Sequence, residues 1–233
     1  MLARNNIIFF IIFSLFALRF NIFLCKSKIA IIGVHDEKYE EIGKWAHINK
    51  KAYAKKHGYD CFLYNTNLDI KRPPYWSKII AILNHLDDYE WLLFLDSDAL
   101  IMNFEIKLEF LIDNDYDLVL AKDMMDHFQS GDFLIRNSPF SKVFLKEWYS
   151  EKYRNTITPP GFDNGALIEM LEDNLSFLKK IKIIPQRMIS SYPVGISNFM
   201  LKNDGEYRSG DFIIHFAGIP HSEKEKLMEE FSL

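Results

Sequence analysis

The sequence has few cysteines and no excess of basic residues, and both absences exclude classes of protein. Its 233 residues contain two cysteines, Cys25 and Cys61, in neither a CxxC pair nor a zinc-type cluster, so a disulfide framework and a structural zinc site are excluded. A formal net charge of −4 offers no basic surface, so no nucleic-acid partner is expected. No GxGxxG or Walker motif occurs, which excludes the usual dinucleotide and P-loop fingerprints.

The remaining composition is that of a folded domain: 48% of residues are hydrophobic and 15% are aromatic. From residue 28 onward, apolar runs typical of strands alternate with segments of helical spacing, which predicts an α/β fold with one mixed, mostly parallel sheet flanked by helices. Asp36 is placed to cap the first helix and Gly58 to end it. The predicted strands are 28–34, 59–64, 91–95, 116–121, 131–136, 181–185 and 210–217.

Residues 1–27 contain a hydrophobic segment that stands apart from this domain. Ile7 to Leu18 is almost wholly apolar, which is short for a membrane span and typical of a signal peptide. Extended to Cys25, it reaches a marginal spanning length. Because no small-x-small cleavage site precedes Lys26, an uncleaved signal-anchor is favoured over a cleaved signal. Residues 28–220 are then expected to form one domain, and residues 221–233 a charged helical tail that packs loosely.

The sequence EWLLFLDSDALIMN places two carboxylates directly after a strongly apolar strand. In an extended segment Asp96 and Asp98 point to the same side, where two carboxylates repel each other and are costly to desolvate. A cation between them removes that cost, and the carboxyl ends of strands are where open α/β sheets bind ligands. The pattern therefore suggests a divalent-metal site that holds a diphosphate.

A DxD pattern is short, and two solvated turn residues after a strand are its commoner explanation. An EF-hand is excluded, because Ala99, Leu100 and Ile101 follow where further oxygen ligands are needed. A phosphatase with an aspartate nucleophile is disfavoured by Leu100, since such enzymes usually carry Thr or Val at that position.

Further motifs follow in a fixed order, and together they resemble the galactosyl/mannosyl/xylosyl transferase family called GMA12/MNN10, or glycosyltransferase family 34. Each motif is weak alone, whereas the set in this order is specific and extends over nearly all of the chain from Lys28 to Gly218. The motifs are YWSK at 75–78, WLLFLDSDALIMN at 91–103, GDFLIRNS at 131–138, FDNGAL at 162–167, PQRMISSYP at 185–193 and GDFIIHFAG at 210–218.

The resemblance implies a GT-A fold and the retaining transfer of a hexosyl or pentosyl unit from a nucleotide sugar (UDP-Gal, GDP-Man or UDP-Xyl class) to a glycan acceptor. It also implies a divalent cation, usually Mn²⁺ and otherwise Mg²⁺, held by Asp96, Asp98 and His215. Taken alone, His215 is more often a satisfied histidine at a strand end than a metal ligand. A catalytically weak pseudoenzyme that binds sugar nucleotides, and a phosphatase using the DxD, are the alternatives.

The same resemblance implies roles for other residues of these motifs. Asp163 and Asn164 are expected beside the donor sugar, where Asp163 acts as a transient nucleophile or stabilises an oxocarbenium-like state. Taken alone, Asp163 is a helix-capping carboxylate and Lys78 a solvated lysine. Arg136 is expected on the acceptor side. The implied donor and acceptor contacts include Lys78, Ser97, Gly131, Arg136, Gln186 and Gly218.

One position departs from the family. Plant members often carry a lysine five positions after the metal histidine, where this chain has Pro220, and Lys224 or Lys226 is the substitute for that phosphate contact. The expected partners are a nucleotide sugar, a glycan acceptor, other glycosyltransferases in a complex, and a membrane bound through the N-terminal segment. The predicted localisation is a single-pass membrane protein of the secretory pathway, in the Golgi if the source is eukaryotic.

Overall fold

The computed structural model describes residues 28–159, 161–195 and 204–232. Within these ranges each strand and helix follows from a local pattern of the sequence. The strands are β1 (Ile29–Val34), β2 (Asp60–Tyr64), β3 (Trp91–Leu95), β4 (Ala99–Ile101), β5 (Leu118–Ala121), β6 (Asp132–Arg136), β7 (Ile181–Ile184) and β8 (Ile213–His215). The helices are α2 (Glu40–His57), α3 (Ser77–Leu83), α4 (Pro139–Trp148), α5 (Phe162–Asp173) and α6 (His221–Ser232).

A six-stranded mixed sheet forms the centre of the molecule, in the order β2-β1-β3-β6-β5-β7. The β1–β2, β1–β3 and β5–β7 pairs are parallel, and β6 runs antiparallel to both of its neighbours. The predicted α/β fold with a mixed, mostly parallel sheet is confirmed. The prediction of a single sheet is incomplete, because β4 and β8 pair as a separate antiparallel ribbon.

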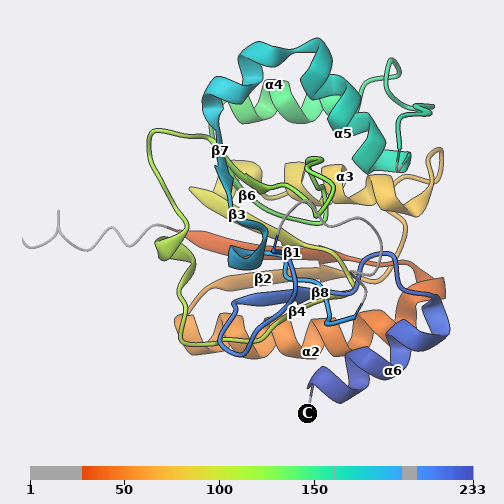
Figure 1. Ribbon diagram of the computed structural model, residues 1–233. Helices are drawn as coiled ribbons and strands as arrows, with labels where there is room; N and C mark the ends of the chain where they lie inside the picture. Colours follow the sequence, from red (N-terminus) through yellow and green to blue (C-terminus); the bar gives the residue numbers. More distant parts are fainter. Residues whose placement is uncertain (1–27, 160, 196–203, 233) are drawn as a thin grey trace, which may run out of the picture.

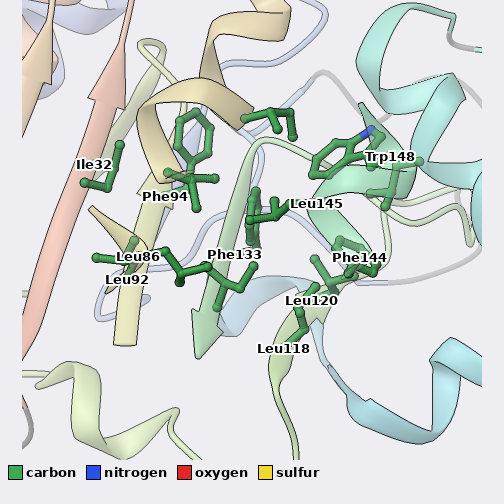
Figure 2. Packing of buried hydrophobic residues seen from close by; sticks show 14 of the residues in the cluster. Ile32, Leu86, Leu92, Phe94, Leu118, Leu120, Phe133, Phe144, Leu145 and Trp148 are labelled. Atoms are coloured by element: carbon green, nitrogen blue, oxygen red, sulfur yellow. The ribbon is translucent and has the colours of Figure 1, made fainter. Parts of the chain in front are cut away.

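Helices cover both faces of the sheet, which gives it the layered form seen in Figure 1: α3, α4 and α5 lie over one face, and α2 and α6 over the other. Consequently β3 is buried along its whole length, as its unbroken apolar run predicted. Its side chains alternate between two cores. Leu92 and Phe94 belong to one core with Phe133 of β6 and Trp148 of α4 (Figure 2), whereas Leu93 and its odd-numbered neighbours face α2.

The ends of α2 test two sequence predictions. Gly58 adopts a left-handed conformation with φ of 71°, so it ends the helix as predicted. The prediction for Asp36 is wrong, since its side chain accepts no capping hydrogen bond and a short 3-10 turn, Glu37–Tyr39, precedes α2.

The C-terminal tail is helical, as predicted, but it does not pack loosely. Helix α6 lies against α2, and Met228 is completely buried among Ile42, Leu100 and Phe216. The hydrophobic segment at residues 1–27 lies outside the described residues. Among the described helices none combines the length and the apolar character needed to cross a membrane.

Candidate cation and donor site

Asp96 and Asp98 lie on a tight turn that joins the end of β3 to β4. The Asp96 N–H donates to the carbonyl of Gly131, the residue before β6 (2.8 Å), and the Ala99 N–H donates to the Asp96 carbonyl (3.2 Å). The prediction that this segment is extended is therefore wrong. The turn nevertheless keeps both carboxylates on one side, where their ligand atoms and one of His215 all lie within 4.8 Å of one another.

The small β4–β8 ribbon brings His215 to the acidic pair. Ala99 is paired with His215 across the ribbon, and the Phe216 N–H donates to the Asp98 carbonyl (2.9 Å). His215 Nε2 then lies 3.2 Å from Asp98 Oδ1. Two carboxylates and an imidazole form a donor set that suits Mn²⁺. The three residues predicted as metal ligands are thus placed together, with a spacing that fits one cation.

Asp132 orients His215, and the sequence analysis missed it. Its carboxylate is fully buried and lies 2.8 Å from His215 Nδ1, while the Ser190 hydroxyl donates to the same Oδ2 atom (2.6 Å). Burial alone lowers the pKa of His215, but Asp132 and Asp98 outweigh it and hold this pKa well above its ordinary value. A carboxylate on one ring nitrogen leaves the other facing the cation position. An aspartate at the start of an apolar strand, inside the GDFLIRNS motif, was the available signal.

Lys224 of α6 reaches the same turn from the other side. Its Nζ lies 2.5 Å from Asp98 Oδ2, and its side chain is only 7% exposed. Burial raises the pKa of Asp98, but His215 and Lys224 overcome this and hold it well below its usual range. Of the two lysines proposed to replace the missing family lysine, Lys224 is buried at the site and Lys226 is exposed.

Lys78 links the acidic pair to the predicted catalytic aspartate. Its buried Nζ lies 2.8 Å from Asp163 Oδ2 and 3.2 Å from Asp96 Oδ1, and it donates to the Ser130 carbonyl (3.0 Å). It is therefore not a solvated lysine. Burial raises the pKa of Asp96 to about 6, with Lys78 opposing that rise and Asp98 adding to it. The Lys78 ammonium group thus lies between the carboxylates of Asp96 and Asp163, which would otherwise repel each other.

Asp163 and Asn164, in the first turn of α5, are held against Ser130. The Ser130 hydroxyl donates to Asp163 Oδ2 (2.8 Å), and the Ser130 N–H donates to Asn164 Oδ1 (2.6 Å). The Trp148 indole N–H donates to the Asp163 carbonyl (2.8 Å), so the backbone is fixed as well. These contacts aim the Asp163 side chain at Lys78 and the cleft.

Glycine is needed at position 131 because of close packing. A Cβ atom on Gly131 would lie 2.3 Å from His215 Cε1 and 2.9 Å from Asp96 Oδ2, closer than side chains can approach. Gly218 lines the cleft with φ of 73°. Ser97 lies in the acidic turn between the two carboxylates. The structure therefore brings all three of these predicted residues to the site.

Two predicted residues are not brought to the surface of the site. Arg136 is paired with Trp91, at the opposite end of β3 from Asp96, and donates to the Asn114 carbonyl (3.1 Å). Because β6 runs antiparallel to β3, the last residue of β6 lies beside the first residue of β3, at the end of the strands away from the acidic turn. Gln186 is buried and donates to the Ser190 carbonyl (3.2 Å), so it supports the chain behind the cleft rather than lining it.

Two hollows meet at the acidic turn, and Asp96 and Asp98 line both. The larger has a volume of about 510 Å³ and the smaller about 360 Å³. Residues that line the larger one include Met124, Gln129, Asp163, Asn164, Tyr192, His215 and Gly218. Residues that line the smaller one include Val34, His35, Asp36, Tyr39, Tyr75, Lys78 and Ser97.

Solved structures with a similar fold support the predicted GT-A architecture. A glycosyltransferase involved in glycosylation of the major capsid of PBCV-1 aligns with a TM-score of 0.65 at 14% identity, covering 87% of this chain and 98% of that one. The galactosyltransferase LgtC, solved with donor and acceptor sugar analogs, aligns with a TM-score of 0.55 at 13% identity, covering 87% and 95%. At these identities the likeness establishes the fold.

Sequence comparison identifies relatives with named activities. The chain is 28% identical to the "probable alpha-1,2-galactosyltransferase gmh2" of Schizosaccharomyces pombe, over 73% of this chain and 58% of that protein. It is 26% identical to the "probable alpha-1,6-mannosyltransferase MNN10" of Saccharomyces cerevisiae, over 73% and 53%. It thus spans little more than half the length of these relatives. The sequence profile of one family matches residues 26–122 and 109–225, almost the whole chain, so the protein belongs to the galactosyl transferase GMA12/MNN10 family.

Proposed function

We propose that this protein is a metal-dependent, retaining glycosyltransferase that moves a hexosyl or pentosyl unit from a nucleotide sugar to a glycan acceptor. The observation that carries the proposal is the convergence of Asp96, Asp98 and His215 at the junction of two hollows. A cation held there touches both hollows, so a ligand with a diphosphate at its centre suits the site. Family membership and the names of the relatives support the same class of reaction.

The two hollows suit the two halves of a nucleotide sugar. The smaller is lined by Tyr39, whose aromatic ring suits stacking on a base, and by Asp36, whose carboxylate suits hydrogen bonds from a ribose. The larger contains Asp163 and Asn164 and leaves room for the sugar and the acceptor. In this arrangement the transferred sugar lies beside Asp163.

Mn²⁺, or Mg²⁺ in its place, fits the ligand set of Asp96, Asp98 and His215. The cation would act as a Lewis acid that offsets the charge of the departing diphosphate. Lys224 is placed to contact the same phosphates, because its ammonium group already lies against Asp98. A lysine, as a compact charge, suits a phosphate oxygen.

Asp163 is the group best placed to act on the sugar carbon. Lys78 and Ser130 both contact its Oδ2 atom, which fixes the orientation of the carboxylate. Such a carboxylate either attacks the anomeric carbon and displaces the nucleoside diphosphate, so that the acceptor hydroxyl opens the covalent intermediate in a second displacement, or stabilises an oxocarbenium-like state. In the second route the acceptor attacks on the face that the diphosphate leaves, and the departing phosphate takes the acceptor proton. Both routes retain the configuration of the sugar, and both use Asp163.

The test is a screen of UDP- and GDP-sugars for hydrolysis and transfer in the presence of Mn²⁺. Asp98→Ala is expected to lose donor binding and turnover, whereas Asp163→Ala should lose turnover and keep donor binding. The matched control is Asp115→Ala, an exposed aspartate in the loop before β5. A folded wild-type protein that neither binds nor cleaves any of these donors would refute the proposal. Phosphate release from simple esters would indicate the phosphatase alternative.

We also propose that residues 1–27 anchor the chain in a membrane of the secretory pathway, such as the Golgi, where it assembles with other glycosyltransferases. The support is the apolar segment of the sequence from Ile7 onward. A fluorescent fusion of the full chain should resist alkaline carbonate extraction, and a fusion lacking residues 1–27 should be released. Extraction of both fusions alike would contradict the proposal.

A further inference from the structure

Two adjacent residues of α2, Asn49 and Lys50, form hydrogen bonds with the backbone at both ends of the segment that carries the acidic pair. Lys50 Nζ donates to the carbonyls of Leu95 (3.0 Å) and Asp96 (2.6 Å), where β3 passes into the turn. Asn49 Nδ2 donates to the Ile101 carbonyl (2.9 Å), and Asn49 Oδ1 accepts from the Ile101 N–H (2.8 Å). These hydrogen bonds therefore hold the last residue of β3 and the last residue of β4, and the acidic turn lies between them.

Burying the Lys50 ammonium group at this position costs free energy. Its side chain is completely buried, and an ammonium group removed from water costs several kcal/mol before its partners compensate. A well-packed apolar side chain commonly serves stability as well as a buried charge does. A requirement of the site explains this lysine better than a requirement of the core.

We propose that Asn49 and Lys50 are positioning residues of the cation site, which fix the backbone of the acidic turn so that Asp96 and Asp98 are held in ligand geometry. This inference rests on the proposed function, since it requires the two carboxylates to bind a cation. Neither residue contacts the ligand atoms themselves. Lys50 acts through the Leu95 and Asp96 carbonyls, and Asn49 acts through the pairing of β4 with β8, which also places His215.

If Lys50 acted through its charge alone, its removal would change the cation affinity in the direction opposite to that expected for a positioning residue. An ammonium group repels a neighbouring cation, so removing it would strengthen binding of the cation. A role in positioning predicts weaker binding, because the carbonyls of Leu95 and Asp96 lose their partner and the turn is released. The direction of the change in cation affinity therefore separates the two roles.

The experiment measures the dissociation constant of Mn²⁺ alone, by electron paramagnetic resonance of the free ion, on the full chain well below its unfolding temperature. Lys50→Met keeps the length of the side chain and removes the amine, and we expect it to weaken Mn²⁺ binding about tenfold or more. Lys51→Met is the matched control, because Lys51 is the next residue of the same helix and is exposed. The control should bind Mn²⁺ as the wild type does. Unchanged or tighter binding by folded Lys50→Met would overturn the inference.

Asn49→Ala keeps the inference testable if Lys50→Met does not fold, which circular dichroism will reveal. It removes both contacts with Ile101 and leaves Lys50 in place, so weaker Mn²⁺ binding is again expected, and wild-type affinity in the folded variant would overturn the inference. A wild-type protein that binds no Mn²⁺ contradicts the proposed function instead. The two failures are therefore distinguishable.

Discussion

Replacing Lys224 with methionine tests the view that its ammonium group stands in contact with a cation ligand. Lys224 and Asp98 form a pair whose side chains are 7% and 12% exposed, so the solvent screens it little. Removing one partner of a buried pair costs about 3–5 kcal/mol. Because Asp98 keeps His215 at 3.2 Å, we expect the lower end, about 3 kcal/mol. For a domain of this size that loss lowers Tm by roughly 6–12 °C in the absence of divalent cations.

Addition of Mn²⁺ should reduce the difference in Tm between Lys224→Met and the wild type. The cation supplies the positive partner that Asp98 lost, so the variant should gain more stability from saturating Mn²⁺ than the wild type gains. The assay is thermal unfolding followed by circular dichroism, in EDTA and in Mn²⁺. Lys226→Met, an exposed lysine on the same helix, should unfold like the wild type in both conditions. If the difference in Tm between Lys224→Met and the wild type is the same in EDTA and in Mn²⁺, the reasoning is refuted.

Three further outcomes are expected at the same site. Gly131→Ala places a methyl group 2.3 Å from His215 Cε1, so displacement of this ligand should lower turnover about 100-fold, and wild-type rates would contradict that. Asp132→Asn weakens the hold on His215 Nδ1 and should weaken Mn²⁺ binding about 10–100-fold, with exposed Asp126→Asn as control; equal affinities would count against this role. Because Mn²⁺ must displace protons from His215, whose pKa is raised, and from Asp96, whose pKa is about 6, its affinity should rise from pH 5 to pH 8; a flat profile measured by calorimetry would argue against it.

The parts of the fold that depend on local patterns were predictable from the sequence. An unbroken apolar run followed by two aspartates gave β3 and the position of the acidic pair after it, since a strand buried on both faces requires such a run. Helical spacing and Gly58 gave α2 and its end. Motifs in family order led to His215, Asp163 and Lys78, which the structure brings together with the acidic pair.

Tertiary structure decided what depends on strand direction and on distant pairing. Arg136 lies at the wrong end of the sheet because β6 runs antiparallel, and alternation of apolar residues does not encode direction. Asp132, Lys50 and Lys224 are charged residues that local patterns assign to the surface, and only packing of segments far apart in the sequence buries them around the acidic turn. The sequence by itself determined which residues could hold a cation. The three-dimensional fold determined which buried charges hold those residues in place, because burial and ion pairing arise only when the sheet, α2 and α6 are assembled.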